Sequence, residues 1–424
     1  MAKYVFVQKA VCGMGGAQQY LYKKINFLIE NGFEVKVIVG VAGEMIIKKL
    51  APYQNLVEGI SISPCFFNRR HQKKIIDQAI QIIQPKEDED IYIESCTAST
   101  SLWCEMIAKR LNCRHVSFDF EEVFHNLTKT QLDFHNFKHL RREICGISVN
   151  ALPLMFKGYK EVAPEEAYTY NAMCSDPMDD ITDDPKTNNL IEKLKKYDLV
   201  IGTIGRAEKP FLIPTLKGIL RYIQSKPHLK FAVLFIGGAE QKKYENEAAK
   251  IFSNVKNADF FCTGSIFPIP RSLAKMCNAF VSSSGSASST AREGIPTVAI
   301  SPITFGANGI LNYTTRYSAI SQEEGNLTIE SQLTEIIDNN FCQTHSNLGL
   351  YDGIDLAKDY QIQCNRQIDF VVNNTSPLEY YDVSLVKKEG KIALVALAAR
   401  IVGKGLFLWA LRLLEKSNIT LIKG

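Results

Sequence analysis

Several features that would mark other protein classes are missing from this sequence. It has no CxxC pair, and the closest two of its eleven scattered cysteines are Cys96 and Cys104. This excludes a zinc ribbon and a CxxC redox pair, and an odd number of unclustered thiols favours a reducing compartment. No window of about 18 residues is apolar and free of charge, so no membrane-spanning helix is predicted. The first residues also lack the apolar segment of a signal peptide, so we expect a cytoplasmic protein.

Neither sign of charge dominates the composition. The 424 residues include 49 basic and 45 acidic side chains, and the net charge of +4 is too small to indicate nucleic acid as the main partner. Hydrophobic residues make up 46% of the chain, which is enough for a sizeable core. The length is that of two or three domains of about 150 residues each.

Short β-type segments alternate with helical segments through both halves of the chain. In the first half, strands are expected at Tyr4–Val7, Phe33–Val39, Ile91–Ile93 and His115–Phe118. In the second half, they are expected at Leu199–Gly205, Phe231–Gly237, Asp259–Gly264, Ala279–Ser284 and Thr297–Ser301. This alternation predicts an α/β protein with two doubly wound domains, at 1–172 and 198–365, and closing helices with a tail at 366–424. Ligands of such sheets bind beyond the carboxyl ends of the strands.

Between the two series, residues 173–197 are acidic and interrupted by proline. Like charges in such a run repel and stay hydrated, so we interpret the stretch as a linker. The alternative is a metal site built from its paired aspartates, Asp179, Asp180, Asp183 and Asp184. The pair His135 and His139 lacks the glutamate of a zinc-protease helix, and we predict no metal.

Two segments that follow strands carry residues suited to phosphate. Gly13–Gly16 lets the backbone approach a ligand at a helix N-terminus, although a tight turn would need the same glycines. Gly205–Lys209 carries Arg206 and Lys209, two cations that could clamp a diphosphate. The alternative is a solvated loop in which they pair with Glu208.

A third segment, Ser282–Thr290, follows a strand and opens a helix. Its hydroxyls and the free helix N–H groups could bind a phosphate or a ribose, and a plain capping turn is the alternative. In the first half, Asp119, Glu121 and His125 follow a strand end. One of them could orient a substrate hydroxyl, although surface charges need no such role.

In these segments the chain resembles glycosyltransferases of the GT-B fold, nearest the large retaining family 4 group. GMGGAQQYLYKKINFLIENGFEVKVIVG resembles that family's N-terminal Gly-Gly-Ala-Glu loop, helix and second strand, and IGTIGRAEKP resembles its Gly-Arg loop. LFIGG, FFCTGSIFPIPRSLAKMCNAFVSSS and GIPTVAIS resemble the nucleotide-binding half in the same order. The likeness covers roughly residues 4–340.

The resemblance implies two facing Rossmann-like domains that move a sugar from a nucleotide-diphosphate donor, such as a UDP- or GDP-sugar, to an acceptor hydroxyl. It implies no cofactor and no obligatory metal, with catalysis resting on electrostatic stabilisation of the departing diphosphate. Gly15 and Gly16 match the N-terminal phosphate loop, and Arg206 and Lys209, which follow Gly205, match the catalytic basic pair.

On the acceptor side, the resemblance implies roles for residues of the first domain, and Asp119, Glu121 and His125 are the candidates. The acceptor would be a saccharide or a lipid-linked saccharide.

The match is incomplete where the family carries two glutamates eight positions apart before Gly-x-Pro. Those positions hold Val281 and Ser289, and the nearby carboxylate is Glu293. The segment looks more like the loop of lipid-linked N-acetylglucosamine transferases and sugar-nucleotide epimerases. We expect Glu293 at the ribose and the rest of the donor on small residues, Gly285, Ser286, Ser288, Ser289 and Thr290.

Three functions therefore remain open. The leading hypothesis is a cytoplasmic glycosyltransferase of bacterial surface-polysaccharide synthesis. A sugar-nucleotide epimerase is the second, and a non-catalytic nucleotide-sugar-binding protein is the third.

The tail concentrates basic charge, with seven Lys or Arg and two Glu in residues 387–416. In a helical projection, Arg400 and Lys404 fall on one half, and Ile401 and Leu408 lie toward the other. Such a helix could lie on an anionic membrane surface. The alternatives are a closing helix packed on the first domain, or an oligomer contact.

Overall fold

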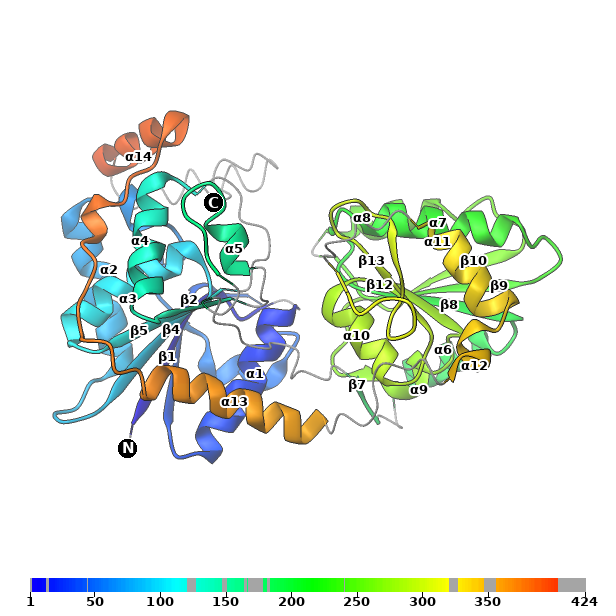
Figure 1. Ribbon diagram of the computed structural model, residues 1–424, viewed down its shortest axis with the longest axis horizontal. Helices are drawn as coiled ribbons and strands as arrows, with labels where there is room; N and C mark the ends of the chain where they lie inside the picture. The colour runs from blue at the N-terminus through cyan, green and yellow to red at the C-terminus, as the bar shows by residue number, and fades with distance from the viewer. Residues whose placement is uncertain are drawn as a thin grey trace. The chain divides into compact units, whose positions relative to one another are not determined.

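The architecture was obtained from a computed structural model (Figure 1). It describes residues 2–12, 15–43, 45–119, 127–146, 151–163, 166, 178–180, 184–239, 241–319, 327–346 and 356–402. The chain divides into two compact units. Unit 1 comprises residues 1–13, 17–175 and 356–424, and unit 2 comprises residues 14–16 and 176–355. Each unit contains a six-stranded sheet.

The sheet of unit 1 is entirely parallel, in the order β3-β2-β1-β4-β5-β6. Its strands are β1 (Lys3–Ala10), β2 (Glu34–Val41), β3 (Asn55–Leu56), β4 (Ile91–Ser95), β5 (Arg114–Asp119) and β6 (Ile144–Gly146). The helices between them are α1 (Gly16–Glu30), α2 (Arg69–Ile83), α3 (Ala98–Leu111) and α4 (Lys129–Leu140), and α5 (Ala151–Met155) follows β6. Val5, Val7 and Ile93 are buried in the core cluster that includes residues of α2 and α3. The predicted parallel alternation is therefore confirmed here.

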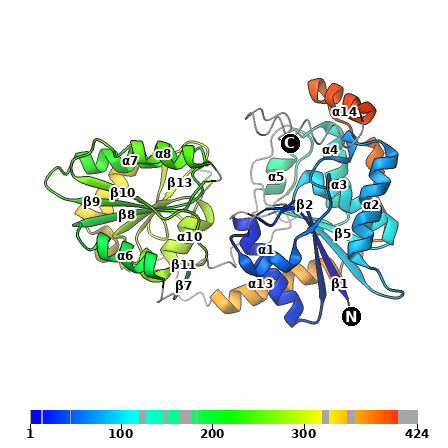
Figure 2. The ribbon, with the colours of Figure 1, turned by 180° about the vertical axis from the view of Figure 1, so that it is seen from behind.

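Two helices from the end of the chain complete unit 1. Helix α13 (Leu356–Val372) lies beside α1 in both views (Figures 1 and 2), and Tyr20 Oη and Gln367 Oε1 are 3.0 Å apart. Helix α14 (Gly390–Val402) buries Ala396 and Ala399 in the same core as α2 and α3. The inner face of α14 therefore agrees with one alternative given for the tail, a closing helix packed on the first domain.

The sheet of unit 2 has the order β10-β9-β8-β12-β13-β14, with β14 antiparallel at its edge. Its strands are β8 (Leu199–Ile204), β9 (Phe231–Ile236), β10 (Ala258–Cys262), β12 (Ala279–Ser282), β13 (Thr297–Ile300) and β14 (Ala307–Ile310). A small separate sheet pairs β7 (Met178–Asp179) with β11 (Ile269–Pro270). The helices are α6 (Pro185–Leu194), α7 (Leu212–Gln224), α8 (Lys242–Lys250), α9 (Arg271–Ala274), α10 (Ser284–Arg292), α11 (Ile329–Leu333) and α12 (Phe341–Thr344).

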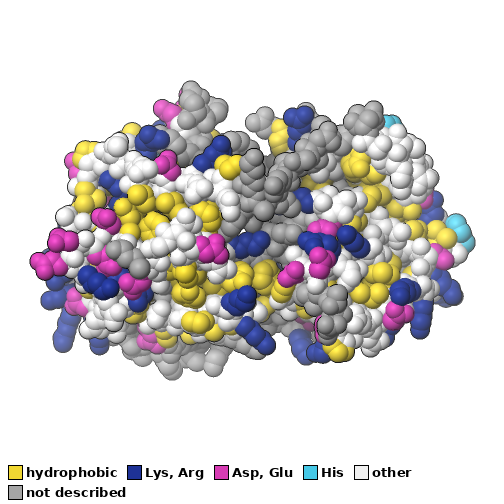
Figure 3. Space-filling view, turned by 90° about the horizontal axis from the view of Figure 1, so that it is seen from below, with side chains coloured by type: hydrophobic (Ala, Val, Ile, Leu, Met, Phe, Trp, Pro, Cys, Tyr) yellow, Lys and Arg dark blue, Asp and Glu magenta, His cyan; other side chains and the backbone are white. Residues whose placement is uncertain are grey.

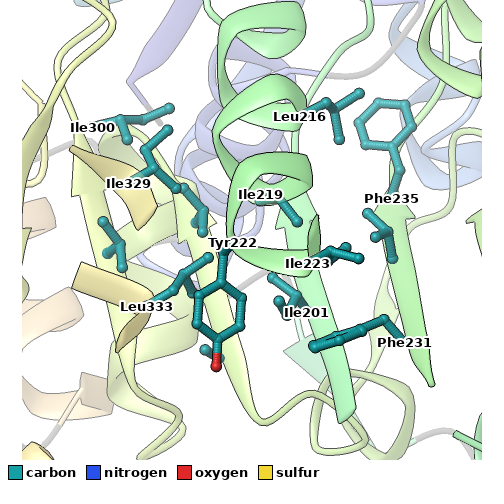
Figure 4. Packing of buried hydrophobic residues seen from close by; sticks show 14 of the residues in the cluster. Ile201, Leu216, Ile219, Tyr222, Ile223, Phe231, Phe235, Ile300, Ile329 and Leu333 are labelled. Carbon is teal, nitrogen blue, oxygen red and sulfur yellow. The ribbon is translucent and has the colours of Figure 1, made fainter. Parts of the chain in front are cut away.

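Both faces of this second sheet are covered, which explains its continuous apolar strands. All six residues of β9, FAVLFI, are buried. Val233 and Phe235 join the cluster under α7, where Ile219 and Tyr222 pack (Figure 4), while the intervening Leu234 joins the cluster on the other face. Alternate strand residues thus bury apolar surface on opposite sides, as a doubly wound parallel sheet requires.

The stretch expected to be a linker, 173–197, differs from that interpretation in part, because it contains β7 and α6. Asp184 caps α6 by accepting hydrogen bonds from Lys186 N and Thr187 N, and Pro185 occupies the first helical position. Leu194 is fully buried in the core of unit 2. The Asp-Pro pair here starts a helix. Asp183 lies outside the described residues, and no metal-binding cluster was found among the described ones.

The surface carries mixed charge. Figure 3 shows basic and acidic side chains interspersed among hydrophobic ones on one face. None of the described helices is both long and apolar enough to cross a membrane.

Candidate functional site

The carboxyl ends of β8 and β12 form the switch point of the second sheet. These two strands are neighbours, and from them the connections run toward opposite edges of the sheet. Their ends are joined directly, because the backbone N–H of Ile204 donates to Ser282 Oγ at 3.1 Å. Doubly wound sheets bind ligands at such a point, since the loops diverge and leave a crevice there.

The loop that follows β8 is held by the backbone of the next strand. Gly205 N donates to Ile236 O at 3.2 Å, and Ala207 N donates to Gly238 O at 3.0 Å. Gly237 must be glycine, because a Cβ at this position would overlap the carbonyl oxygen of Gly205. The loop therefore leaves the strand in a fixed direction.

This loop presents the two predicted cations, Arg206 and Lys209, as exposed side chains. Lys209 N donates to Arg206 O at 3.1 Å, so a single turn brings the two residues together. Partial desolvation and, second, the Arg206 guanidinium lower the pKa of Lys209. A nearby anion would relieve this repulsion. Open space surrounds the Cα of Gly205, where a Cβ would meet no atom within 4 Å.

The helix that follows β12 is α10, and its N-terminus lacks a side-chain cap. Ser283 occupies the N-cap position, where serine normally accepts a hydrogen bond from the first turn. Its Oγ is instead buried and has no hydrogen-bond partner among the described residues, although the residue is only 5% exposed. An unsatisfied buried hydroxyl beside free helix N–H groups is suited to a ligand oxygen.

The start of α10 is also tied to a segment near the sheet edge. Ser284 N donates to Ser318 O at 2.6 Å, and Ser284 has a φ of +56°. Gly285 and Ser286 in the first turn remain accessible, and a Cβ on Gly285 would meet nothing within 4 Å. The structure thus brings Gly285 and Ser286 to the same sheet end as Arg206.

The later hydroxyls of the serine-rich segment bond within the fold. Ser288 is buried, and Ser289 Oγ donates to Gly285 O at 2.8 Å. Thr290 Oγ1 donates to Ala287 O and lies 2.9 Å from Thr297 Oγ1 in β13. These three predicted residues are therefore buried on the inner side of α10, and Thr290 links the helix to β13.

Glu293 lies at the opposite end of α10 from Ser283. Its carboxylate accepts from Arg271 Nε at 2.8 Å and lies 3.8 Å from Lys275 Nζ. Arg271 also pairs with Asp180 at 2.9 Å, which joins β7, α9 and α10. The hydrogen bond to Glu293 raises the pKa of Arg271 further above its normal range.

Gly15 directly precedes α1 and Gly16 opens it, and a Cβ on Gly16 would meet nothing within 4 Å. Asp119 is the last residue of β5, and its side chain is not described. Glu121 and His125 lie outside the described residues.

The histidine pair of α4 is used within unit 1. His135 is buried, and the Nδ1 of His139 lies 2.9 Å from Lys160 Nζ. The Nε2 of His139 lies 3.0 Å from the carbonyl of Glu166. Since an ammonium can only donate, Nδ1 of His139 is the acceptor and the ring is neutral.

Two features of this region were not predicted from the sequence. Ser282 links the two central strands, and Ser318 accepts a hydrogen bond from Ser284 N, which lies 34 residues earlier in the sequence. Ser282 stands in a conspicuous serine run, whereas nothing local in the sequence marks Ser318.

Comparison with protein-family models gives no match, and comparison with curated proteins gives no significant match. Solved structures do share the fold. A glycosyltransferase from Rickettsia africae matches with a TM-score of 0.55 and 15% identity over 91% of this chain and 95% of its own. Anabaena HepE, in complex with UDP and glucose, matches with a TM-score of 0.54 and 14% identity over 88% of this chain and 97% of its own. A Listeria monocytogenes protein described as a candidate UDP-N-acetylglucosamine 2-epimerase matches with a TM-score of 0.51 and 11% identity over 87% of this chain and 94% of its own. The predicted fold class, GT-B with a helical C-terminal segment, is therefore confirmed.

Proposed function

We propose that this chain is a glycosyltransferase whose nucleotide-diphosphate donor is bound in unit 2, by the β8–α7 loop and the N-terminus of α10. One observation carries the proposal. The loop bearing Arg206 and Lys209 and the helix α10 follow adjacent strands at the switch point. At the N-cap position of α10, the Ser283 hydroxyl is buried and has no partner among the described residues. Two cations, a helix dipole and an open hydroxyl suit a diphosphate.

In the proposed reaction, the bond between the sugar's anomeric carbon and the diphosphate oxygen breaks, and a bond to the acceptor oxygen forms. Negative charge develops on the departing UDP or GDP, and its diphosphate oxygen takes up the proton that the acceptor hydroxyl loses. Arg206 can bind two phosphate oxygens at once, and Lys209 adds a second positive charge. The two cations and the helix N-terminus stabilise this charge most where it develops, so the proposal includes no metal and no cofactor.

The remaining predicted residues have places in this proposal. Gly15 and Gly16 would contribute backbone N–H groups to the donor phosphates, and Asp119, Glu121 and His125 would belong to the acceptor side. The acceptor would be a saccharide or a lipid-linked saccharide of a bacterial surface polysaccharide. The enzyme would then act in the cytoplasm, at the inner face of the membrane when its acceptor is lipid-linked.

A sugar-nucleotide epimerase is the second candidate. It is favoured by the serine-rich segment that stands where family 4 transferases carry paired glutamates, and a candidate epimerase is among the proteins with a similar fold. An epimerase would need an acid and a base positioned at the donor sugar. A protein that binds the nucleotide sugar without turnover is the third.

Incubation with a panel of UDP-, GDP- and dTDP-sugars distinguishes the three functions, with products separated by chromatography. A transferase would hydrolyse one donor slowly on its own, and would consume that donor faster, with transfer of the sugar, when a saccharide acceptor is added. Interconversion of two sugars on an intact nucleotide would establish the epimerase instead. Tight binding of a donor with neither reaction would contradict both enzymatic functions.

A further inference from the structure

Helix α14 has two apolar faces, and only one of them is covered. On the inner face, Ala396 and Ala399 are buried, and Arg400 Nε donates to Cys65 O at 2.7 Å. On the outer face, Leu394 is 70% exposed and Ile401 is 79% exposed. The inner contacts fix how the helix is rotated, so the outer face is set by the fold.

The outer face is a continuous stripe. Leu394, Leu397, Ala398 and Ile401 follow the spacing i, i+3, i+4 and i+7, and all four are exposed. A single exposed leucine needs no explanation, but four aligned apolar side chains on one helix indicate a surface that another body covers.

A basic cluster lies beside this stripe. Helix α2 begins with Arg69, Arg70, Lys73 and Lys74, all exposed. No carboxylate lies within salt-bridge distance of these four in the part of the chain that the structure describes.

The two elements are in contact at their ends. The side chain of Asn68, the N-cap of α2, donates to Arg400 O at 3.4 Å. Helix α14 also packs on the short helix Pro64–Phe66, which precedes α2. The stripe and the four cations therefore form one region, called here the α2–α14 surface.

The positive charge of the α2–α14 surface distinguishes three possible occupants, which are a second copy of the chain, the following segment and an anionic lipid surface. A second copy of this chain would bring four more cations to the same surface and, among the residues described there, no acidic cluster to match them. The following segment, residues 403–424, carries four basic side chains and one acidic one, so the cluster would repel it too. An anionic lipid surface suits both features, because its acyl boundary takes apolar side chains and its phosphates take cations.

We propose that the α2–α14 surface binds an anionic membrane surface. Leu394, Leu397 and Ile401 enter the interface between headgroups and acyl chains, and the cations of α2 contact lipid phosphates. The proposal concerns unit 1 alone and does not depend on which reaction unit 2 performs. It differs from the division expected from the sequence, because Arg400 is held by Cys65 and the cations come from α2. Lys404 and Leu408, on which that expectation also rested, lie outside the described residues.

Flotation of the full chain with vesicles tests this proposal. At low salt, the protein should float with vesicles rich in phosphatidylglycerol and stay behind with phosphatidylcholine alone. Lys73→Glu with Lys74→Glu should weaken partition by at least about thirtyfold, since each cation near such a surface contributes about a factor of five. The matched control, Lys193→Glu with Lys196→Glu, reverses two exposed cations of unit 2 and should bind as the wild type does.

The apolar stripe has its own variant and control. Leu394→Ser, Leu397→Ser and Ile401→Ser together should abolish the binding that remains at moderate salt, whereas Ile29→Ser with Leu140→Ser should not. Unchanged flotation of the stripe variant, with folding verified by circular dichroism, would overturn the proposal. Concentration-dependent dimers that the stripe variant loses, without any vesicle binding by the wild type, would assign the surface to a second copy instead.

Discussion

A Cβ atom on Gly237 would overlap the carbonyl oxygen of Gly205, so the turn after β9 fits against the loop after β8 only because residue 237 is glycine. Gly237→Ala should therefore lower the free energy of unfolding by about 1–3 kcal/mol and displace the Arg206 loop. Gly205→Ala is the matched control, because a Cβ there meets nothing within 4 Å. Denaturant unfolding of both variants measures the difference. Equal stability of the two would contradict the packing described here.

The hydroxyls of α10 should separate into two groups. Ser283→Ala removes a buried hydroxyl that has no partner in the part of the chain that the structure describes, so the ligand-free protein should keep its stability or gain slightly. The same change should weaken UDP binding by about tenfold or more, because one hydrogen bond to a charged group is worth about 1.5–3 kcal/mol.

Ser289→Ala is the comparison, because its hydroxyl already bonds to Gly285 O. It should affect stability and leave UDP affinity within about twofold. Isothermal titration and thermal unfolding of both variants provide the data. If Ser289→Ala loses the affinity and Ser283→Ala keeps it, the site has been assigned to the wrong end of the helix.

Glu293 was expected to contact the ribose of the donor, and in the structure it pairs with Arg271. Variants of both residues therefore distinguish a ribose contact from a structural ion pair. Glu293→Gln and Arg271→Gln break the same ion pair, so both should lower the stability of unit 2 by about 1–3 kcal/mol. We expect similar UDP affinity in both variants, because the carboxylate already has two cationic partners. A selective loss in Glu293→Gln would establish the ribose contact.

Acid should destabilise unit 1 as the pH falls below about 6.5, because two of its histidines are buried as neutral rings. Burial, and then the Lys138 ammonium, lowers the pKa of His115 to about 4, and burial followed by His115 and Lys138 lowers that of His135 to about 4. Both rings take up a proton more readily in the unfolded chain, so stability is lost as pH falls from about 6.5 to 4. Glu105 extends the loss below pH 4. Burial alone would raise its pKa, but Lys138 and His115 lower it to about 2.

His135→Leu should reduce this loss. Between pH 6.5 and 4, the slope of the unfolding free energy against pH should fall by the amount that corresponds to about one bound proton. Over this range the difference from the wild type in unfolding free energy adds up to about 3 kcal/mol. The exposed His228→Gln should leave the slope unaltered. Urea unfolding at a series of pH values measures it, and an unchanged slope for His135→Leu would contradict neutral burial of that ring.

Sequence patterns predicted the strands well because each buried strand is a short apolar run between glycine or polar turns. They predicted that Ser282–Thr290 follows a strand and opens a helix, and the structure begins α10 within this segment, at Ser284. They missed α6, because the acidic run was interpreted as a hydrated linker. Asp184 directly before Pro185 is instead a typical helix start, with an N-cap followed by proline at the first helical position.

The ionic cores of unit 1 could not have been predicted. Lys24 is buried with its Nζ 2.6 Å from Glu94 Oε2, and Lys138 is buried between Glu105 and Glu143. Lysine is usually exposed, and the partner of Lys24 lies 70 residues away. The position of Arg206 and Lys209 directly after β8 was predictable, because Gly205 marks the strand end. The contact of Ser284 with Ser318 depends on tertiary packing that no local pattern records.

The most direct test of the proposed function is calorimetric titration of the ligand-free chain with UDP and GDP, comparing Arg206→Ala with Lys217→Ala. Arg206 lies at the switch point of the second sheet, and Lys217 is an exposed cation on α7 that serves as the matched control. Loss of one charge-assisted contact is worth about 1.5–3 kcal/mol, so Arg206→Ala should bind nucleotide about ten- to a hundredfold more weakly. Lys217→Ala should bind as the wild type does. Equal nucleotide affinity in the wild type and in a folded Arg206→Ala variant would contradict the account.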